Sequence, residues 1–190
     1  MASGGGYSVM TLFQAFGQFA SAGVALDDFR LITSQTFTSV SSVSFDDCFS
    51  ADYDHYLIAN KMISGADTAA VMRLRAGGSS DSSTNYSRQE FYSNGSGETE
   101  TRITGETSYG AGLGYLDTSL YNATLTFVSY PFASIDTSFY TACSEGVDDI
   151  PNWLNIHQIG WHNVASSYDG FEVPFTTTVT GSIHVYGWAV

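Results

Sequence analysis

In the segment VMRLR, residues 71–75, the large apolar side chains of Met72 and Leu74 alternate with Val71, Arg73 and Arg75. Met72 and Leu74 would project from one face of an extended chain, and the residues between and beside them from the other. Such a two-residue period is typical of a half-buried β-strand. Other segments that share this period are residues 37–45, 53–59, 86–92, 99–104, 120–130, 153–161 and 175–187.

Together these segments predict roughly eight to ten short strands, with turn-forming residues between them. Residues 94–97, Asn-Gly-Ser-Gly, would connect two arms of a hairpin, and Pro131 would end the long strand before it. No alternation of strands with helical segments occurs. The sequence therefore predicts an all-β fold over residues 31–190: one antiparallel β-sandwich, jelly-roll-like in its topology.

Residues 1–30 differ from the rest because they are apolar without a two-residue period. Leu12, Phe16 and Phe19 have the spacing of a helix, although Gly17 and Gly23 each weaken one by roughly 1 kcal/mol. The segment is expected to be either a core element of the same domain or an N-terminal arm or short helix that packs on a neighbouring subunit. In the second case Leu12, Phe13, Phe16 and Phe19 would make the contacts with other subunits or with a larger assembly.

Composition excludes several classes of function. The chain has 190 residues, with 6 Lys+Arg against 19 Asp+Glu and a formal net charge of -13. Such a chain cannot neutralise phosphates, so no nucleic-acid partner is expected. No basic residue precedes the N-terminal apolar stretch, which is also too short and broken to span a bilayer, so neither a secretory signal nor a membrane partner is expected.

No constellation of residues indicates an enzyme or a cofactor. An acidic cluster could offer hard oxygens to calcium, but it lacks the spacing of an EF-hand and is better explained as a solvated turn; it comprises Asp46, Asp47, Asp52 and Asp54. Zinc is not expected from the four histidines, His55, His157, His162 and His184. In a strand, His157 and His162 have opposite parity and would lie on opposite faces. No serine or cysteine stands beside a recognisable base.

Two groups of aromatic residues are candidates for contact with a partner or a glycan. The glycine-rich run at residues 109–115 resembles a phosphate loop only superficially and predicts a flexible outward loop, with Tyr109, Leu113 and Tyr115 suited to contact. Trp153, Trp161 and Tyr168 could stack on sugar rings, although alternating strands usually place such side chains in the core. The outward loops would be residues 77–85, 93–98 and 108–116.

The remaining residues of interest are two cysteines and two arginines. Cys48 and Cys143 permit one disulfide, but a chain of this length needs no covalent staple, which favours buried free thiols. Arg73 and Arg75 share one strand face near Asp-rich segments, and we expect each to pair with a carboxylate within or between subunits.

The segment FDDCFSADYDHYLIANKMISGADTAAVMRLRAGG, residues 45–78, resembles structural proteins and tail-fibre domains of tailed bacteriophages, cyanophages among them. The shared features are FDDCF at 45–49, YDHY at 53–56, RLR at 73–75 and the Gly-Gly pair at 77–78. The end of the chain, TGSIHVYGW at 180–188, resembles the terminus of the same proteins.

This resemblance implies a non-enzymatic virion protein, made in the host cytoplasm and assembled with other capsid, neck or tail proteins. Its role would be that of a tail or head fibre, an adaptor or a capsid decoration, and it would act as a homo-oligomer, most plausibly a trimer. The alternative is a carbohydrate-binding module that attaches to host surface glycans.

Overall fold

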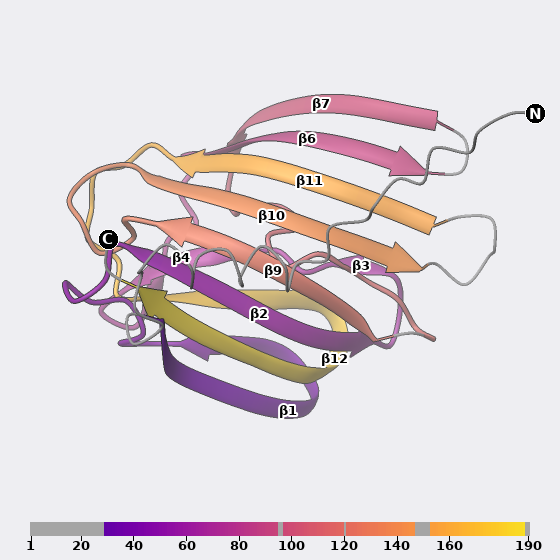
Figure 1. Ribbon diagram of the computed structural model, residues 1–190, viewed down its shortest axis with the longest axis horizontal. Helices are drawn as coiled ribbons and strands as arrows, with labels where there is room; N and C mark the ends of the chain where they lie inside the picture. Colours follow the sequence, from indigo (N-terminus) through magenta and orange to yellow (C-terminus); the bar gives the residue numbers. More distant parts are fainter. Residues whose placement is uncertain (1–28, 95–96, 120, 147–152, 189–190) are drawn as a thin grey trace, which may run out of the picture.

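The fold is all-β and antiparallel. A computed structural model describes residues 29–94, 97–119, 121–146 and 153–188, and within these ranges it contains twelve strands and no helix (Figure 1). The strands are β1 Arg30–Phe45, β2 His55–Ser64, β3 Thr68–Ala69, β4 Arg73–Ala76, β5 Ser79–Ser80, β6 Tyr86–Asn94, β7 Gly97–Glu106, β8 Tyr115–Leu116, β9 Asn122–Ser129, β10 Thr137–Gly146, β11 Trp153–His162 and β12 Gly170–Trp188.

Ten strands form one large sheet in the order β5-β4-β12-β2-β9-β10-β11-β6-β7, with β1 added alongside β12. The other two, β3 and β8, form a small separate sheet. Neighbouring strands in both sheets run antiparallel. The prediction of an all-β, antiparallel fold is therefore confirmed.

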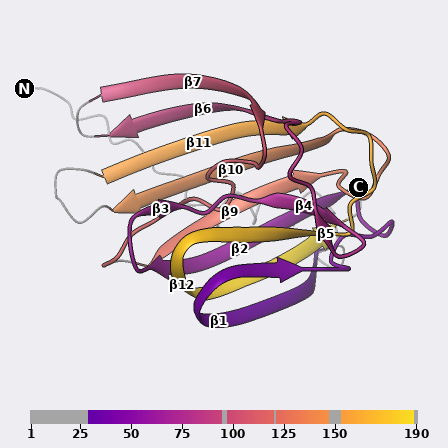
Figure 2. The same ribbon diagram turned by 180° about the vertical axis from the view of Figure 1, so that it is seen from behind.

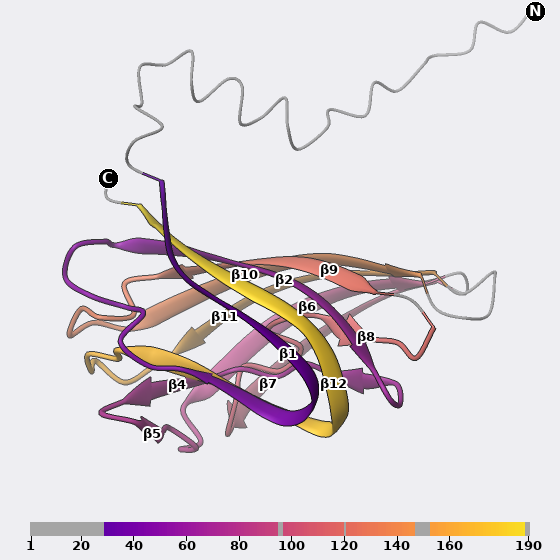
Figure 3. The same cartoon turned by 90° about the horizontal axis from the view of Figure 1, so that it is seen from below.

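The large sheet curls because β1 and β12 bend together. The second half of β12 pairs with β2, whereas its first three residues pair with β4. β1 follows β12 through the bend, where its register shifts and Ser39 adopts a positive φ of 53°. Shifts of this kind are β-bulges, which kink a strand and increase its twist. As a result, β4 and β5 lie over one face of the sheet (Figures 2 and 3).

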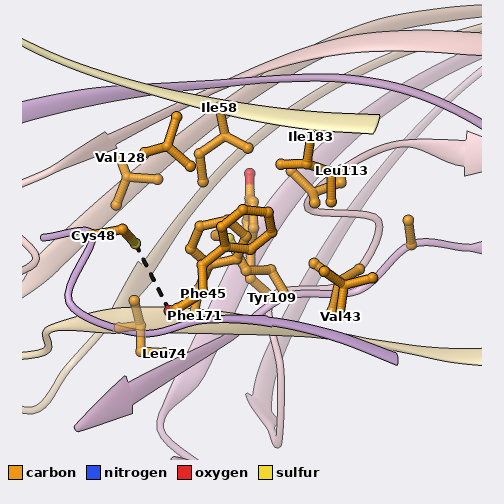
Figure 4. Packing of buried hydrophobic residues seen from close by; sticks show 14 of the residues in the cluster. Val43, Phe45, Cys48, Ile58, Leu74, Tyr109, Leu113, Val128, Phe171 and Ile183 are labelled. Carbon is orange, nitrogen blue, oxygen red and sulfur yellow. Dashed lines mark hydrogen bonds between the residues drawn. The ribbon is translucent and has the colours of Figure 1, made fainter. Parts of the chain in front are cut away.

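The hydrophobic core fills the space between this folded-over part and the long strands (Figure 4). Phe45 and Phe171 stack with their ring centroids 4.9 Å apart. Opposite them lie Ile58, Val128 and Ile183, which are fully buried. We call the face of the sheet that supplies these residues the inner face, and the opposite one the outer face.

The glycine-rich run lies on the inner face rather than on the surface. Tyr109 forms a bridge with Met72, and the hydroxyls of Thr126 and Thr141 donate to the carbonyl of Gly112. A Cβ on Gly160 would stand 2.3 Å from Cε2 of Tyr109, so only glycine allows this approach. The predicted outward loop at 108–116 is therefore wrong: its glycines serve close packing against the sheet.

Most of the predicted strands are present. The expected hairpin corresponds to β6 and β7, the long segment at 120–130 to β9, and the segment at 175–187 to part of the longer β12. Met72 and Leu74 are buried and their neighbours partly exposed, as the alternation at 71–75 predicts. The predicted N-terminal arm, 1–30, falls almost entirely outside the described residues, and Arg30 already begins β1.

Candidate functional site

The outer face of the curled sheet contains a row of large apolar side chains. Each directly opposes the next across neighbouring strands, so all of them project to the same side. The row crosses β1, β12, β2, β9, β10 and β11, and we call it the outer apolar stripe: Leu31, Tyr186, Leu57, Phe127, Tyr140 and Ile159.

Both ends of the outer apolar stripe are exposed. The exposed fraction of the side chain is 54% for Leu31, 39% for Tyr140 and 59% for Ile159. Leu57, in the middle, is buried although it faces outward, because Tyr186 and Phe127 flank it. Contiguous exposed apolar surface is uncommon on proteins that work as isolated monomers and marks sites of interaction.

Aromatic rings extend the stripe at its β12 end. Phe29 stacks on Tyr186 at 5.0 Å between ring centroids, with the planes 6° apart. Trp188 lies beside both Phe29 and Phe127, and His55 stacks on Trp188 at 5.4 Å. This end of the stripe is thus a packed aromatic cluster. Its surface is rigid, because aromatic side chains have few rotatable bonds.

At the other end the stripe is bordered by polar groups. The hydroxyl of Tyr140 and Nδ1 of His157 are 3.3 Å apart. Phe91 directly opposes His157 on the same face and is itself exposed. This end combines ring faces with hydrogen-bonding groups, an arrangement suited to contact with a protein or a sugar.

Few of the contact residues predicted from the sequence lie on this surface. Tyr109, Leu113 and Tyr168 are buried, so their predicted contact with an external partner is wrong; the physical reason is that they pack in the core. Tyr115 is partly buried against Ile156.

Trp161 alone of these candidates lies on the outer face, one row from the stripe. It is partly exposed, and the guanidinium of Arg102 lies 5.8 Å from its ring centroid. The predicted contact residues Leu12, Phe13, Phe16 and Phe19 lie outside the described residues, as does the side chain of Trp153.

A second group of polar residues lies at the end of the inner face. Nε2 of His162 is 3.2 Å from Oδ2 of Asp81, and the hydroxyl of Tyr168 donates to the same oxygen at 2.7 Å. The backbone amide of Ser83 donates to Asp81 Oδ1 at 2.8 Å. The carboxylate thus ties the 77–85 loop to the connection between β11 and β12, and this loop is anchored at its centre.

The surroundings of this group shift two of its pKa values. Burial lowers the pKa of His162, against the opposing effect of the Asp81 carboxylate, so the ring is neutral at pH 7. Burial alone would raise the pKa of Asp81, but hydrogen bonds from Ser83 and Tyr168 outweigh it and hold that pKa below its usual range. A neutral imidazole beside a carboxylate is a feature of some catalytic sites. Here the hydroxyl of the buried Tyr168 donates to the same carboxylate oxygen, which fits a structural role.

The described residues include no group of three or more His, Cys, Asp and Glu side chains placed to hold a metal ion. Within the acidic cluster, Asp46 instead pairs with Arg75, with Oδ1 2.7 Å from Nε. His157 and His162 lie on opposite faces, as their parity predicts. We therefore identify no metal site in the described ranges.

Predictions for single residues had mixed outcomes. Arg75 pairs with a carboxylate as predicted. Arg73 forms no ion pair with a carboxylate of the described residues, since its Nε donates to the carbonyl of Thr107 at 3.2 Å, and its pairing between subunits stays a prediction. Cys48 is a buried free thiol, as predicted, and burial raises its pKa far above the ordinary value. The side chain of Cys143 lies outside the described residues.

Sequence reasoning did not identify the outer apolar stripe, although a signal was present. In β2 and β9, large apolar residues occur at both parities: Ile58 beside Leu57, and Val128 beside Phe127. A strand with one solvated face would show them at only one parity. That doubling indicates a second apolar face, but which face is covered becomes clear only from the strand order.

Known proteins give no further guide to this surface. No protein-family model, no curated protein and no solved structure matches this chain. Among the described residues, no helix has the length and apolar character needed to cross a membrane.

Proposed function

We propose that this chain is a non-enzymatic structural module of a tailed-bacteriophage virion, and that the outer apolar stripe is its assembly surface. The observation that carries the proposal is the exposure of Leu31, Tyr140 and Ile159 in one row across six strands. Exposed apolar side chains lose unfavourable hydration when a second protein covers them, at about 25 cal/mol per Å² of buried area.

The sequence supports the same proposal independently of the surface. The stretches at 45–78 and 180–188 resemble virion and tail-fibre proteins, and both contribute strands to the large sheet. The finer fold class that we propose is a jelly-roll-like sandwich, since β1 and β12 pass together from one part of the sheet to the other. Such modules assemble as homo-oligomers with closed symmetry, and a trimer is the form we propose.

The partners would be capsid, neck or tail proteins, with the protein made in the host cytoplasm and found in the virion. A net charge of -13 favours an outward surface that repels nucleic acid and stays soluble away from the stripe. Under this proposal another protein binds at the stripe, because the side chains there are uncharged.

Quantitative mass spectrometry of gradient-purified particles from the phage that encodes the chain tests the proposal. We expect the protein in the particles at a fixed ratio to the major capsid protein. Its absence from purified particles, with abundance only in the soluble lysate, would contradict the proposal.

A second experiment tests the surface itself. In particles of a phage whose gene for this chain carries Ile159→Asp, the amount of the protein should fall several-fold. Ile135→Asp is the matched control, because Ile135 is 49% exposed but lies between β9 and β10, off the stripe. Equal amounts of the two variants in the particles would argue against assembly through the stripe.

Glycan binding is the second candidate function, and the polar border of the stripe favours it. Tyr140 and Trp161 present rings on the outer face, and His157 and Arg102 beside them offer hydrogen bonds. A glycan array with the wild type and Trp161→Ala distinguishes this candidate, with Tyr121→Ala as a control for loss of an exposed ring elsewhere. Selective binding that only Trp161→Ala abolishes would favour the glycan, and a flat response would exclude it.

A further inference from the structure

The outer apolar stripe raises the question of what covers it before assembly. Tyr140 and Ile159 are exposed in the described part of the chain, and Phe91 beside them is also exposed. An uncovered surface of this kind is an aggregation risk in the free subunit. A covering segment from the same chain would remove that risk.

The described part of the chain begins on this same face. Phe29 stacks on Tyr186 and tilts against Trp188, so its ring continues the stripe at the β12 end. Every residue that precedes Phe29 is therefore joined to the molecule at the edge of the exposed surface.

The sequence of those preceding residues suits an apolar surface. The first 26 residues contain no Asp, Glu, Lys or Arg, and four large apolar side chains occur within eight positions: Leu12, Phe13, Phe16 and Phe19. In a chain with a net charge of -13, an uncharged stretch of this length is the segment that meets the least repulsion at the sheet.

The length of the connection is sufficient. Phe29 comes ten positions after Phe19. An extended chain spans at most about 3.3–3.6 Å per residue, or about 35 Å over these ten steps. From β12 to β11 the stripe crosses four strand spacings of about 4.8 Å each, or about 19 Å. Residues 12–19 can thus lie over Tyr140 and Ile159 with slack in the connection.

We propose that residues 12–19 dock on the outer apolar stripe of their own chain and cover Tyr140 and Ile159 in the free subunit. A short tether gives the segment an effective concentration on the order of millimolar, so even weak apolar contact suffices. The biological role of this docking rests on the proposed function: during assembly, another virion protein would displace the segment and bind the stripe in its place. The docking itself is a property of the isolated protein.

Photo-crosslinking tests the docking on the purified full chain. Benzoylphenylalanine at position 16 should crosslink to peptides that contain Tyr140 or Ile159. Mixing unlabelled with ¹⁵N-labelled protein before irradiation separates the two origins of such a link: we expect only links within one isotope. Mixed-isotope links would mean exchange between copies, and links elsewhere would mean a different docking site; either result would overturn the inference.

Limited chymotrypsin digestion provides a matched comparison. Cleavage after Phe13, Phe16 or Phe19 should be at least about ten-fold faster in Ile159→Ser than in the wild type, because the substitution removes an apolar side chain that the docked segment would bury. A ten-fold change corresponds to about 1.4 kcal/mol. Ile135→Ser, with a similarly exposed isoleucine off the stripe, should cleave at the wild-type rate. Equal rates in all three proteins would overturn the inference, whatever mass spectrometry of the particles finds.

Discussion

Arg75 joins segments that are far apart in the sequence. Its Nε lies 2.7 Å from Oδ1 of Asp46, its Nη1 donates to Ser80 Oγ at 2.9 Å, and its Nη2 donates to the carbonyl of Gly78. Ser80 in turn donates to Glu172 at 2.5 Å. The guanidinium therefore fixes the β4–β5 hairpin against the start of β12 and the end of β1.

Arg75→Glu should destabilise the protein by about 1–3 kcal/mol. The change removes the donors to this hairpin and places a carboxylate beside Asp46 and Glu172. The ion pair itself contributes only a part, about 0–1 kcal/mol, because Asp46 is exposed and the pair is screened. Urea unfolding measures the loss; Arg102→Glu, on the exposed strand β7, should stay within about 0.5 kcal/mol of the wild type. Equal midpoints for the two variants would disprove the role of Arg75.

His162 should make stability depend on pH in the mildly acidic range. Burial lowers its pKa in the folded state, while the unfolded chain binds a proton near the ordinary value of about 6.5. Above that value the group is neutral in both states and stability is complete. As the pH falls below about 6.5, the unfolded state gains protons first, so the free energy of unfolding declines until the folded pKa is passed.

The nearby groups that bear on this titration are Asp81, Asp136, Tyr86 and Tyr168. Asp81, whose pKa is held low, adds a further loss only as the pH falls below about 3.8. The test compares urea midpoints at pH 8, 6.5 and 5. Between pH 6.5 and 5 the midpoint should fall more steeply in the wild type than in His162→Gln. His157→Gln, in an exposed position on the outer face, should follow the wild type. Parallel curves for all three proteins would refute the prediction.

Single residues could be predicted where local pattern decides their place, and not where remote segments do. The parity of Leu74 and Met72 follows from five residues of sequence, and their burial was predicted. Tyr109 is different, because its burial depends on Gly160 of β11, which lies 51 positions further along the chain. No local pattern contains that information.

At the level of elements, alternation predicted the strands but not the bends in them. β12 runs for 19 residues, because bulges in its partner β1 let the pair turn without a loop. The glycine-rich run shows the same limit: its composition fits a surface loop, yet the hydroxyls of Thr126 and Thr141 hold it on the inner face. The candidate stripe depends on strand order, which the sequence alone did not provide.

Strand β7 is an exposed edge of the large sheet, paired on one side with β6. Its sequence, GETETRITGE, places charged residues along the strand, and Glu98 and Glu100 are exposed. Charges on edge strands oppose pairing with another sheet. We infer that they keep this edge from competing with the outer apolar stripe as a site of association.

Replacing Glu98 and Glu100 together by Val should therefore cause aggregation, seen as light scattering at a concentration where the wild type stays clear. The double variant Asp52→Val with Asp54→Val removes the same charge and adds the same side chains in the exposed connection between β1 and β2. It should remain soluble. If both double variants aggregate alike, loss of charge rather than the unprotected edge is the cause.

Across the whole molecule, acidic groups far outnumber the arginines that can pair with them. Within the described ranges, three carboxylates form ion pairs with arginine: Asp46 with Arg75, and Glu90 and Glu106 with Arg88. The net charge of -13 is thus largely uncompensated. Such self-repulsion destabilises a compact state, and its range is about 30 Å at 0.01 M salt but about 8 Å at 0.15 M.

The melting temperature should accordingly rise by several degrees when NaCl is raised from about 10 to about 300 mM, in line with the few degrees that each kcal/mol contributes in a protein of this size. A triple variant with Asp52→Lys, Asp67→Lys and Glu98→Lys, all at exposed positions, lowers the excess of negative charge without touching an ion pair. It should melt higher than the wild type at low salt and respond less to added NaCl. Differential scanning calorimetry at the two salt concentrations measures both effects. A wild-type melting temperature that is unchanged or falls with salt would mean that its excess carboxylates lie too far apart to repel one another, and that repulsion does not limit the stability of this fold.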